Sequence, residues 1–451
     1  MTQNKQHSLL NRANEAGRVL KKHIKNGDNI RIISHNDADG ISAAAIIANT
    51  IKEEGGNFHV TMIPRLKKET IEKLHNEKYN LFIFTDMGSA CINHINKLKA
   101  DVIIADHHQP NDTEASENVV HVNPHLFEVD GSRELSGSGA SYLVVRELDK
   151  NHLSIFALIG AFGDMQHLNG FTGVNELILN DAVESGKLEI HEDLKITSKN
   201  QEPLYKAIAY TLDPGLPDLT GSFEGSMAFL EKLGISYGIK FADLSGEEQD
   251  VLKDALIDVN PKIFGQVFST PKDSPALRDL EDFSSILDSC GKSKKYGLGL
   301  SLCLGERDKA LETAIEIQNK YRNNLVKGFE WIRKEGAVEL DHIQYIYSED
   351  PVLKTIIGTL AGVGLFINIL NSEKPVIGIS RFHKDIKISG RTTRELVNKG
   401  VDLGKALHDA SVNFHGQGGG HNIAAGAMIP HKNKDEFLHL VNDIVASQLE
   451  K

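Results

Sequence analysis

The sequence predicts an α/β protein with a parallel sheet in its first part and a second, smaller α/β domain at its C-terminal end. Short apolar runs alternate with helical patterns over the first 165 residues. A Leu-rich and mostly helical stretch follows from about residue 190 to 310, and new strand candidates begin after residue 337. Continuous apolar runs separated by helices are typical of parallel strands that are buried on both faces.

The first part contains strand candidates at residues 30–34, 58–63, 81–85, 102–105 and 119–122. Helical patterns over residues 41–51 and 67–76 separate the first three of them. Helical crossovers of this kind connect parallel neighbours, and such sheets bind ligands beyond the carboxyl ends of their strands. We therefore expect functional residues directly after these strands.

The rest of the chain divides by its patterns. We expect a first domain over residues 1–190, a helical insertion or bridging region over 191–308, a linker helix over 309–336 and a second domain over 337–451. The linker alternates apolar and charged residues and has few helix breakers, as an amphipathic helix does. Strands are expected at residues 343–347 and 376–379.

Composition excludes several classes of protein. The chain has 451 residues, 40% of them hydrophobic, and 62 acidic against 50 basic residues give a net charge of −12. No apolar run reaches the roughly 18 residues of a membrane span, and the first ten residues lack a secretory apolar core. Three scattered cysteines, Cys91, Cys290 and Cys303, provide neither a disulfide framework nor a thiolate metal cage. We expect a cytoplasmic protein without a membrane partner, whose acidity disfavours unspecific coating of long duplexes.

Acidic and histidine side chains follow successive strand candidates. The first part supplies these candidate site residues: His35, Asp37, Asp39, Asp86, Asp106, His107, His108 and Asp164. Any one aspartate alone, Asp164 included, could instead cap a helix or a turn. Their joint placement favours a divalent-metal centre, because carboxylates gathered without cations repel one another. Mixed carboxylate and imidazole ligands suit Mn²⁺, with Mg²⁺ or Co²⁺ as alternatives.

The C-terminal part carries a glycine-rich run and a basic window. Backbone N–H groups of Gly418, Gly419 and Gly420 can approach a phosphate closely, although a flexible loop or a close strand–helix crossing is the alternative. His421 is either a phosphate contact or a buried core histidine. Residues 374–405 hold eight basic and three acidic side chains, a local charge of +5. Within that window Arg391, beside the hydroxyl of Thr392, is the best candidate for binding a phosphate bidentately.

As an ordered set, these motifs resemble the DHH phosphoesterase superfamily, which is named for the run at residues 106–108. The segments LSGSGASY (135–142) and GAFGD (160–164) resemble further family motifs. SGRTT, which begins at Ser389, and GGGH (418–421) look like the companion DHHA1 substrate-binding domain. The length and the helical middle region are similar to those of archaeal RecJ-like exonucleases, including the GINS-associated type.

The resemblance implies roles for individual residues. One divalent ion would be held by His35, Asp37 and Asp86, and a second by Asp39, Asp86, His107 and Asp164. His108 would face the scissile phosphate and Asp106 would orient the histidines. Where this chain has His35, bacterial relatives carry an acidic residue, a departure known from the pyrophosphatase-like branches.

The expected function is a Mn²⁺-dependent exonuclease that hydrolyses single-stranded DNA or RNA, in DNA repair, replication or RNA processing. One alternative is an oligoribonuclease or a hydrolase of small phosphoesters. A third hypothesis is a replication scaffold, since archaeal relatives associate with the GINS complex at the replicative helicase. Single-stranded nucleic acid and GINS are therefore the expected partners.

Overall fold

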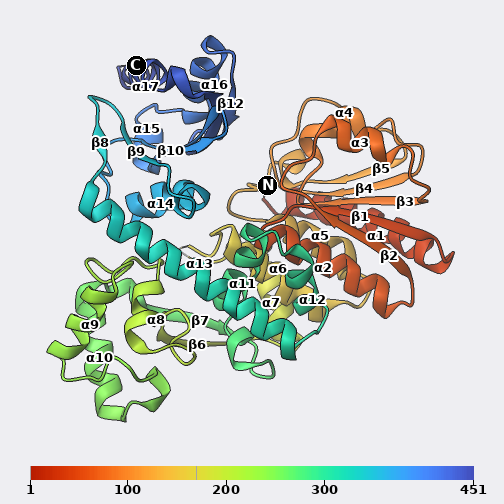
Figure 1. Cartoon of the computed structure of the whole chain (residues 1–451). Coiled ribbons are helices and arrows are strands. Elements are labelled where there is room, and N and C mark those ends of the chain that lie inside the picture. The colour runs from red at the N-terminus through yellow and green to blue at the C-terminus, as the bar shows by residue number, and fades with distance from the viewer. Residues whose placement is uncertain (1, 169, 451) are drawn as a thin grey trace. The chain divides into compact units, whose positions relative to one another are not determined.

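The computed structural model describes residues 2–168 and 170–450, which fold into two compact units. The first unit comprises residues 1–191 and 266–319, and the second comprises residues 192–265 and 320–451. The α/β fold class is confirmed, because strands and helices alternate along both units (Figure 1). No helix among the described residues is both long enough and apolar enough to cross a membrane.

The first unit is built on a five-stranded parallel sheet in the order β2-β1-β3-β4-β5. Its strands are β1 (Asn29–Ser34), β2 (Asn57–Met62), β3 (Leu81–Thr85), β4 (Asp101–Ala105) and β5 (Val119–Val122). All five lie within a residue or so of the predicted runs. They are easily recognised in the sequence because β3 and β5 are buried at every position and β1 and β4 at all but the first.

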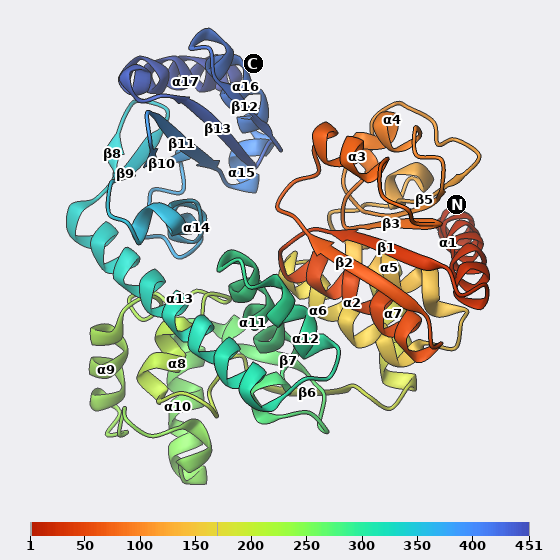
Figure 2. The ribbon, with the colours of Figure 1, turned by 45° about the vertical axis from the view of Figure 1, so that its right-hand side comes forward.

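Helices cover both faces of this sheet, as Figure 2 shows for α3 and α4 on one side and α2, α5, α6 and α7 on the other. The helices of this part are α1 (Thr2–Lys25), α2 (Ala38–Glu53), α3 (Lys68–Leu74), α4 (Ile92–Ile95), α5 (Gly137–Arg146), α6 (Ser154–Gly163) and α7 (Val174–Glu184). The sequence patterns predict no helix before residue 41. Yet Leu9, Ala13, Ala16, Leu20 and Ile24 are all buried at helical spacing, so that α1 packs against α5 and β5.

The middle of the chain is mostly helical, as predicted, with two strands that the prediction did not contain. Its elements are β6 (Glu189–Leu194), α8 (Leu204–Tyr210), α9 (Phe223–Lys232), α10 (Gly246–Val259), β7 (Phe264–Ser269), α11 (Leu280–Lys292) and α12 (Tyr296–Cys303). β6 and β7 form a two-stranded sheet. The stretch 191–308, expected to be a single region, is divided, because α11 and α12 pack against α2 and α11 also against α6. Residues 308–335 form one helix, α13 (Asp308–Glu335), whose first part belongs to the first unit and whose last part belongs to the second.

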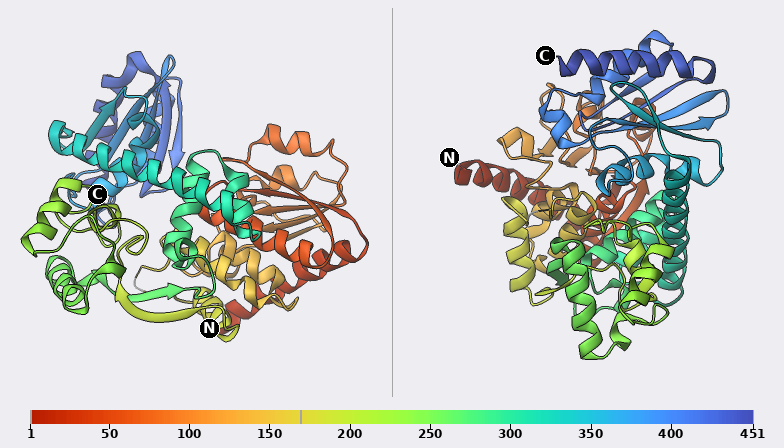
Figure 3. Two further views of the ribbon diagram at one scale, coloured as in Figure 1. Left: turned by 60° about the horizontal axis from the view of Figure 1, so that its bottom comes forward. Right: turned by 90° about the vertical axis from the view of Figure 1, so that its left-hand side faces the viewer.

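A six-stranded mixed sheet in the order β12-β13-β11-β10-β9-β8 forms the C-terminal part of the second unit. Its elements are β8 (Val338–Glu339), β9 (Gln344–Ser348), α14 (Leu353–Phe366), β10 (Val376–Phe382), β11 (Asp385–Arg391), α15 (Arg394–Asn398), α16 (Leu403–Asn413), β12 (Gln417–Gly420), β13 (Ala424–Pro430) and α17 (Lys434–Leu449). β9 and β10 are parallel, while the other neighbours are antiparallel. The apolar residues of α16 and α17 share one core with the sheet, and those of α14 share another with α13. The right-hand view of Figure 3 shows α17, at the end marked C, lying across the strands.

Candidate metal centre

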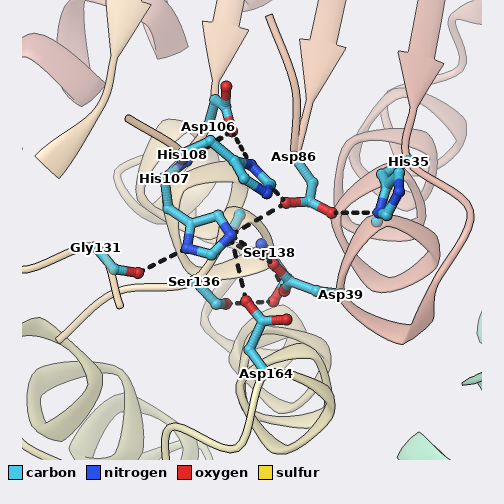
Figure 4. Close-up of polar contacts among 12 residues, drawn as sticks. His35, Asp39, Asp86, Asp106, His107, His108, Gly131, Ser136, Ser138 and Asp164 are labelled. Carbon is cyan, nitrogen blue, oxygen red and sulfur yellow. Dashed lines mark hydrogen bonds and ion pairs between the residues drawn. The ribbon is translucent and has the colours of Figure 1, made fainter. Parts of the chain in front are cut away.

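The predicted acidic and histidine residues of the first part converge at the carboxyl ends of β1, β3 and β4 (Figure 4). His35 and Asp37 directly follow β1, and Asp39 lies in the first turn of α2. Asp86 follows β3, and the run 106–108 follows β4. Asp164 comes from elsewhere, at the C-terminal end of α6.

The first donor group consists of His35, Asp37 and Asp86. Nδ1 of His35 lies 2.8 Å from Oδ2 of Asp37 and 3.4 Å from Oδ2 of Asp86. Despite these short distances, Nδ1 of His35 is buried and has no partner in hydrogen-bonding geometry. This nitrogen and the carboxylate oxygens are close enough to one another to serve together as ligands of one ion.

The second donor group surrounds Nε2 of His107. This nitrogen lies 3.2 Å from Oδ2 of Asp164, 3.3 Å from Oδ1 of Asp86 and 3.9 Å from Oδ2 of Asp39. Oδ1 of Asp86 is buried and, like Nδ1 of His35, lacks a hydrogen-bond partner. Asp86 thus presents one oxygen to His35 and the other to His107. The donor atoms of His35, Asp37 and Asp86 lie within 4.8 Å of one another, and so do those of Asp39, His107 and Asp164.

The backbone at Asp86 is turned to make this sharing possible. Its φ of 54° is in the left-handed region, which residues other than glycine occupy at a cost of roughly 1–2 kcal/mol. The neighbouring Gly137 also matters, because a Cβ atom there would lie 2.6 Å from Oδ1 of Asp86. Only glycine therefore fits at this point.

Asp39 is held by the N-terminus of α5, within the LSGSGASY segment. The backbone N–H groups of Gly137 and Ser138 donate to its two carboxylate oxygens at 2.7 and 2.9 Å. A helix N-terminus stabilises negative charge. Asp37 does cap a helix, since its Oδ1 accepts from the N–H of Gly40 at 3.0 Å. Its other oxygen nevertheless faces His35, so the capping and ligand roles coexist.

The carboxylate of Asp106 accepts hydrogen bonds from neighbouring backbone groups. Its Oδ1 accepts from the N–H groups of His107 and His108 at 2.8 and 3.1 Å and lies 2.9 Å from Nδ1 of His108. Its Oδ2 accepts from the N–H of Ser89 at 2.9 Å. Asp106 therefore fixes the position of His108, whose side chain is 44% exposed.

The charged groups shift one another's pKa. Burial lowers the pKa of His35, but the carboxylates of Asp37 and Asp86 outweigh this and raise it to about 11. Burial also lowers the pKa of His107, yet Asp164 and the other carboxylates around it raise that pKa well above its usual value. Burial raises the pKa of Asp39 to about 6, with a further contribution from Asp86.

The pKa values of two carboxylates in this cluster, Asp164 and Asp86, are shifted in opposite directions. Burial together with the carboxylate of Asp39 raises the pKa of Asp164, whereas His107 and His35 outweigh the burial of Asp86 and hold its pKa well below the usual range. In the protein alone, protons on imidazoles and carboxyls balance the negative charge. A donor set of carboxylates and imidazoles, with two buried donor atoms lacking partners, fits divalent ions that would replace those protons.

Several residues at the site were not predicted. The carbonyl oxygen of Gly131 accepts a hydrogen bond from Nδ1 of His107, and the Nδ2 group of Asn123 donates to the carbonyl of His108 at 2.8 Å. A Cβ atom on Gly291, in α11, would lie 2.0 Å from the carbonyl oxygen of Asn36, between two of the candidate ligands. These contacts join segments that are far apart in sequence, and no periodicity or spacing signals them.

The candidate substrate residues of the second unit lie on neighbouring strands. Gly426 of β13 pairs with Ser389 of β11 on one side and with Gly419 of β12 on the other. The structure therefore brings SGRTT and GGGH to one level of the sheet. Gly419 and Gly420 have φ of 149° and 146°, and the N–H of His421 donates to the carbonyl of Ala424 at 2.9 Å.

Arg391 lies against two glycines of α14. A Cβ atom on Gly362 would meet Cδ and Cγ of Arg391 at 3.5 Å. A Cβ atom on Gly358 would lie 3.7 Å from Nη2 of Arg391 and 3.0 Å from Oγ of Ser389. The guanidinium donates to the carbonyl of Gly390 at 2.8 Å, and burial lowers the pKa of Arg391. Oγ1 of Thr392 is buried and has no hydrogen-bond partner among the described residues.

Comparison with known proteins assigns the chain to a family. Residues 29–159 match the DHH family, N-terminal domain, residues 196–262 match the DHH-CID domain and residues 343–447 match the DHHA1 domain. The uncharacterized protein MJ0831 of Methanocaldococcus jannaschii is 35% identical over 438 residues, which cover 96% of this chain and 97% of that protein. The chain belongs to the DHH family.

Within this family, the DHH protein is similar to RecJ. The single-stranded-DNA-specific exonuclease RecJ of Thermus thermophilus is 26% identical over 174 residues, which span 35% of this chain and only 25% of RecJ. The crystal structure of that RecJ with Mn²⁺ matches 97% of this chain and 55% of its own, with a TM-score of 0.62 at 16% identity. CDC45 from Entamoeba histolytica matches 97% and 99% of the two chains, with a TM-score of 0.73 at 12% identity. The two structural matches establish a shared fold.

Proposed function

We propose that this DHH protein is a divalent-metal-dependent exonuclease that hydrolyses phosphodiester bonds in single-stranded DNA or RNA. One observation carries the proposal: the Asp86 carboxylate lies 3.4 Å from Nδ1 of His35 with one oxygen and 3.3 Å from Nε2 of His107 with the other. A carboxylate shared by two donor groups is what a two-metal site requires. The structure of a RecJ with Mn²⁺, and another with Mg²⁺, supports the choice of these ions, with Co²⁺ as a further alternative.

Each donor group would supply the ligands of one ion. His35, Asp37 and Asp86 would hold the first ion. Asp86 would also reach the second, which would be held by Asp39, His107 and Asp164. When bound, such ions lower the pKa of a water molecule and neutralise the charge that develops on a phosphoryl group.

His108 would contact the phosphate. Burial lowers its pKa, but its hydrogen bond to Asp106 outweighs burial and raises the pKa to about 9. This raised pKa favours the protonated imidazole. Its Nδ1 faces Asp106, and the proton on Nε2 is available to a non-bridging phosphate oxygen.

The second unit would bind the nucleic-acid strand. Arg391 has only a backbone carbonyl as its described hydrogen-bond partner, and the adjacent Thr392 hydroxyl is unpartnered. A half-buried cation beside a buried, unpartnered hydroxyl suits a phosphate. Backbone N–H groups of Gly418, Gly419 and Gly420 would add contacts, with Ser389 and His421 beside them.

The test is hydrolysis by the purified protein. Single strands of DNA and RNA, labelled at either the 5′ or the 3′ end, would be incubated with Mn²⁺, Mg²⁺, Co²⁺ or EDTA. We expect stepwise release of nucleotides that stops in EDTA and in Asp39→Ala, and that persists in the matched surface variant Asp112→Ala. Absence of metal-dependent cleavage, or equal cleavage by Asp39→Ala, would overturn the proposal. Adding dinucleotides to the series separates an exonuclease from the oligoribonuclease alternative.

A replication scaffold is a second candidate, favoured by the similarity in fold to CDC45 along almost the whole of both chains. The two roles are compatible and can be measured independently. Purified GINS would be mixed with the protein and with Asp39→Ala and analysed by size-exclusion chromatography. Co-elution of both would support a scaffold role that does not depend on hydrolysis, and separate elution of both would exclude it.

A further inference from the structure

We propose that Gln166 is a positioning residue that fixes the imidazole of His107 through the carbonyl group of Gly131. The inference rests on the proposed function, because it gives His107 the role of a metal ligand. It concerns how the ring is held rather than which atoms bind the ion. Residues 164–166 would then act on both ring nitrogens of His107. Asp164 lies against Nε2, and Gln166 acts on Nδ1 through Gly131.

The link consists of consecutive hydrogen bonds. The carbonyl oxygen of Gly131 lies 2.6 Å from Nδ1 of His107 and accepts a second hydrogen bond, at 3.1 Å, from Nε2 of Gln166. Oε1 of Gln166 accepts in turn from Nδ2 of Asn175 at 2.7 Å. This last bond fixes the orientation of the amide, so that its donor group faces Gly131.

The two amide side chains are withdrawn from water. Gln166 is 5% exposed and Asn175 is 1% exposed. Water cannot readily replace a hydrogen bond that is lost at such a position. Removing the donor of Gln166 would therefore leave the Gly131 carbonyl with His107 as its remaining partner in this network.

The loop that carries Gly131 depends on these amides. Asn175 donates from Nδ2 to the carbonyl of Arg133 at 3.3 Å and from its backbone N–H to the carbonyl of Glu134 at 2.8 Å. Together with the bond from Gln166 to Gly131, the carbonyls of three residues of the loop 131–134 therefore accept hydrogen bonds from Gln166 or Asn175. A glycine peptide is free to rotate unless such bonds fix it, and rotation at Gly131 would remove the acceptor for Nδ1 of His107.

Gln166 is also close in sequence to a candidate ligand. Asp164 lies against Nε2 of His107 at 3.2 Å, and Met165 between them has a φ of 55°. This left-handed turn lets residues 164 and 166 act on opposite ends of the ring, as Figure 4 shows for the flanking Asp164 and Gly131. When Nδ1 donates to a carbonyl, the lone pair of the neutral imidazole is on Nε2, which is the nitrogen that faces the carboxylates.

The test compares two buried glutamines. Gln166→Met keeps the length of the side chain and removes both the donor to Gly131 and the acceptor for Asn175. The matched control is Gln318→Met, since Gln318 is 3% exposed and donates from Nε2 to Oγ of Ser285 at 3.1 Å. Mn²⁺ binding would be measured by isothermal titration calorimetry on the full chain, with thermal unfolding in EDTA and steady-state hydrolysis of a labelled single strand alongside.

We expect Gln166→Met to bind one of the two Mn²⁺ ions about tenfold more weakly, within the range typical of partners of metal-bound histidines. The other ion, held by the His35 group, should bind as in the wild type. kcat should fall with little change in KM, and Gln318→Met should change neither affinity. If Gln166→Met does not fold, Asn175→Ser, which removes the bond that orients the amide, should weaken the same ion by a smaller factor.

Unchanged Mn²⁺ affinities in a folded Gln166→Met, with only its unfolding temperature lowered, would reduce Gln166 to a structural residue and overturn the inference. Equal weakening of both ions would overturn it as well. These outcomes differ from failure of the proposed function, in which the wild-type protein itself would bind no Mn²⁺ or cleave no strand. A wild type without Mn²⁺ binding would overturn both.

Discussion

Gly160 of α6 and Asp39 of α2 approach so closely that a Cβ atom on Gly160 would lie 2.2 Å from Oδ1 of Asp39. The small residue lets the helix pass directly beneath a candidate metal ligand. That carboxylate is held on its other side by the N-terminus of α5.

Gly160→Ala should displace Asp39 and with it the second donor group. A shift on the order of 1 Å in a reacting group costs about 100-fold in rate, so we expect a fall of that size in kcat. Hydrolysis of a labelled single strand measures it. The control is Gly297→Ala in α12, where an added Cβ atom would meet nothing within 4 Å. Equal activity of both variants would contradict the placement of Asp39 in the site.

Asp86→Asn should weaken both metal ions, whereas His35→Ala should weaken one. The reason is that Asp86 presents an oxygen to each donor group, while His35 contacts only the first. Calorimetric titration with Mn²⁺ measures the two affinities separately. A variant Asp86→Asn that lost one ion and kept the other at full affinity would show that the carboxylate is not shared.

Mn²⁺ affinity should rise with pH. The surrounding carboxylates raise the pKa of His35 to about 11 and raise the pKa of His107 as well, so protons compete with a metal ion for both imidazoles. Each displaced proton makes binding about tenfold tighter per pH unit. Titrations at pH 6.5, 7.5 and 8.5 test this dependence. In His35→Gln the slope for one ion should fall by about one proton, and a slope that stayed the same would contradict the assignment of His35.

Because His121 is buried, the free energy of unfolding should fall as the pH is lowered. His121 is 3% exposed, its Nε2 lies 2.8 Å from Oγ of Ser89, and burial lowers its pKa to about 4 despite an opposing effect of Asp106. An unfolded histidine has a pKa near 6.5, so the unfolded state binds more protons between pH 6.5 and 4. Stability that is present above pH 6.5 is therefore lost through this window, by about 2 kcal/mol at pH 5.

Urea unfolding at pH 7.5 and pH 5 in EDTA measures that loss. His121→Gln should show a smaller difference between the two pH values than the wild type. His7→Gln, on an exposed position of α1, serves as the control and should behave as the wild type does. An undiminished pH dependence in His121→Gln would assign the acid sensitivity to other groups.

Arg391→Ala should weaken binding of the nucleic-acid strand. A hydrogen bond to a charged group contributes about 1.5–3 kcal/mol, which corresponds to roughly 10- to 100-fold in affinity. Fluorescence anisotropy with a labelled oligonucleotide would measure the loss, and KM should rise with it. Lys399→Ala is the control, because that lysine is exposed and paired with Glu395. Unchanged binding by Arg391→Ala would remove Arg391 from the substrate site.

Four strands of the first sheet, β1, β3, β4 and β5, could be predicted from the sequence because they are almost entirely buried. β3 (Leu81–Thr85) has the predicted boundaries, since every one of its residues is apolar or buried and a polar residue begins the loop beyond it. The edge helix α1 was missed, because its apolar residues are spaced among many charged ones and the first ten residues are polar. Likewise α11 and α12 gave no sign that they pack against α2, because an apolar helix face does not specify its partner.

The sequence alone determined the parallel sheet and the set of carboxylates and imidazoles that follow its strands. This was possible because parallel strands place their carboxyl ends at one edge, so residues that follow different strands meet there. The resemblance to the family already implied that Asp86 serves both ions, but only the tertiary structure showed the distances from its two oxygens to His35 and His107 and the hydrogen bonds that join Gln166, Gly131 and His107. Those relationships depend on a backbone turn at Asp86 and on hydrogen bonds between loops 35 residues apart in the chain. Such contacts join segments that are distant in the chain. Nothing in the local pattern of either segment specifies its partner.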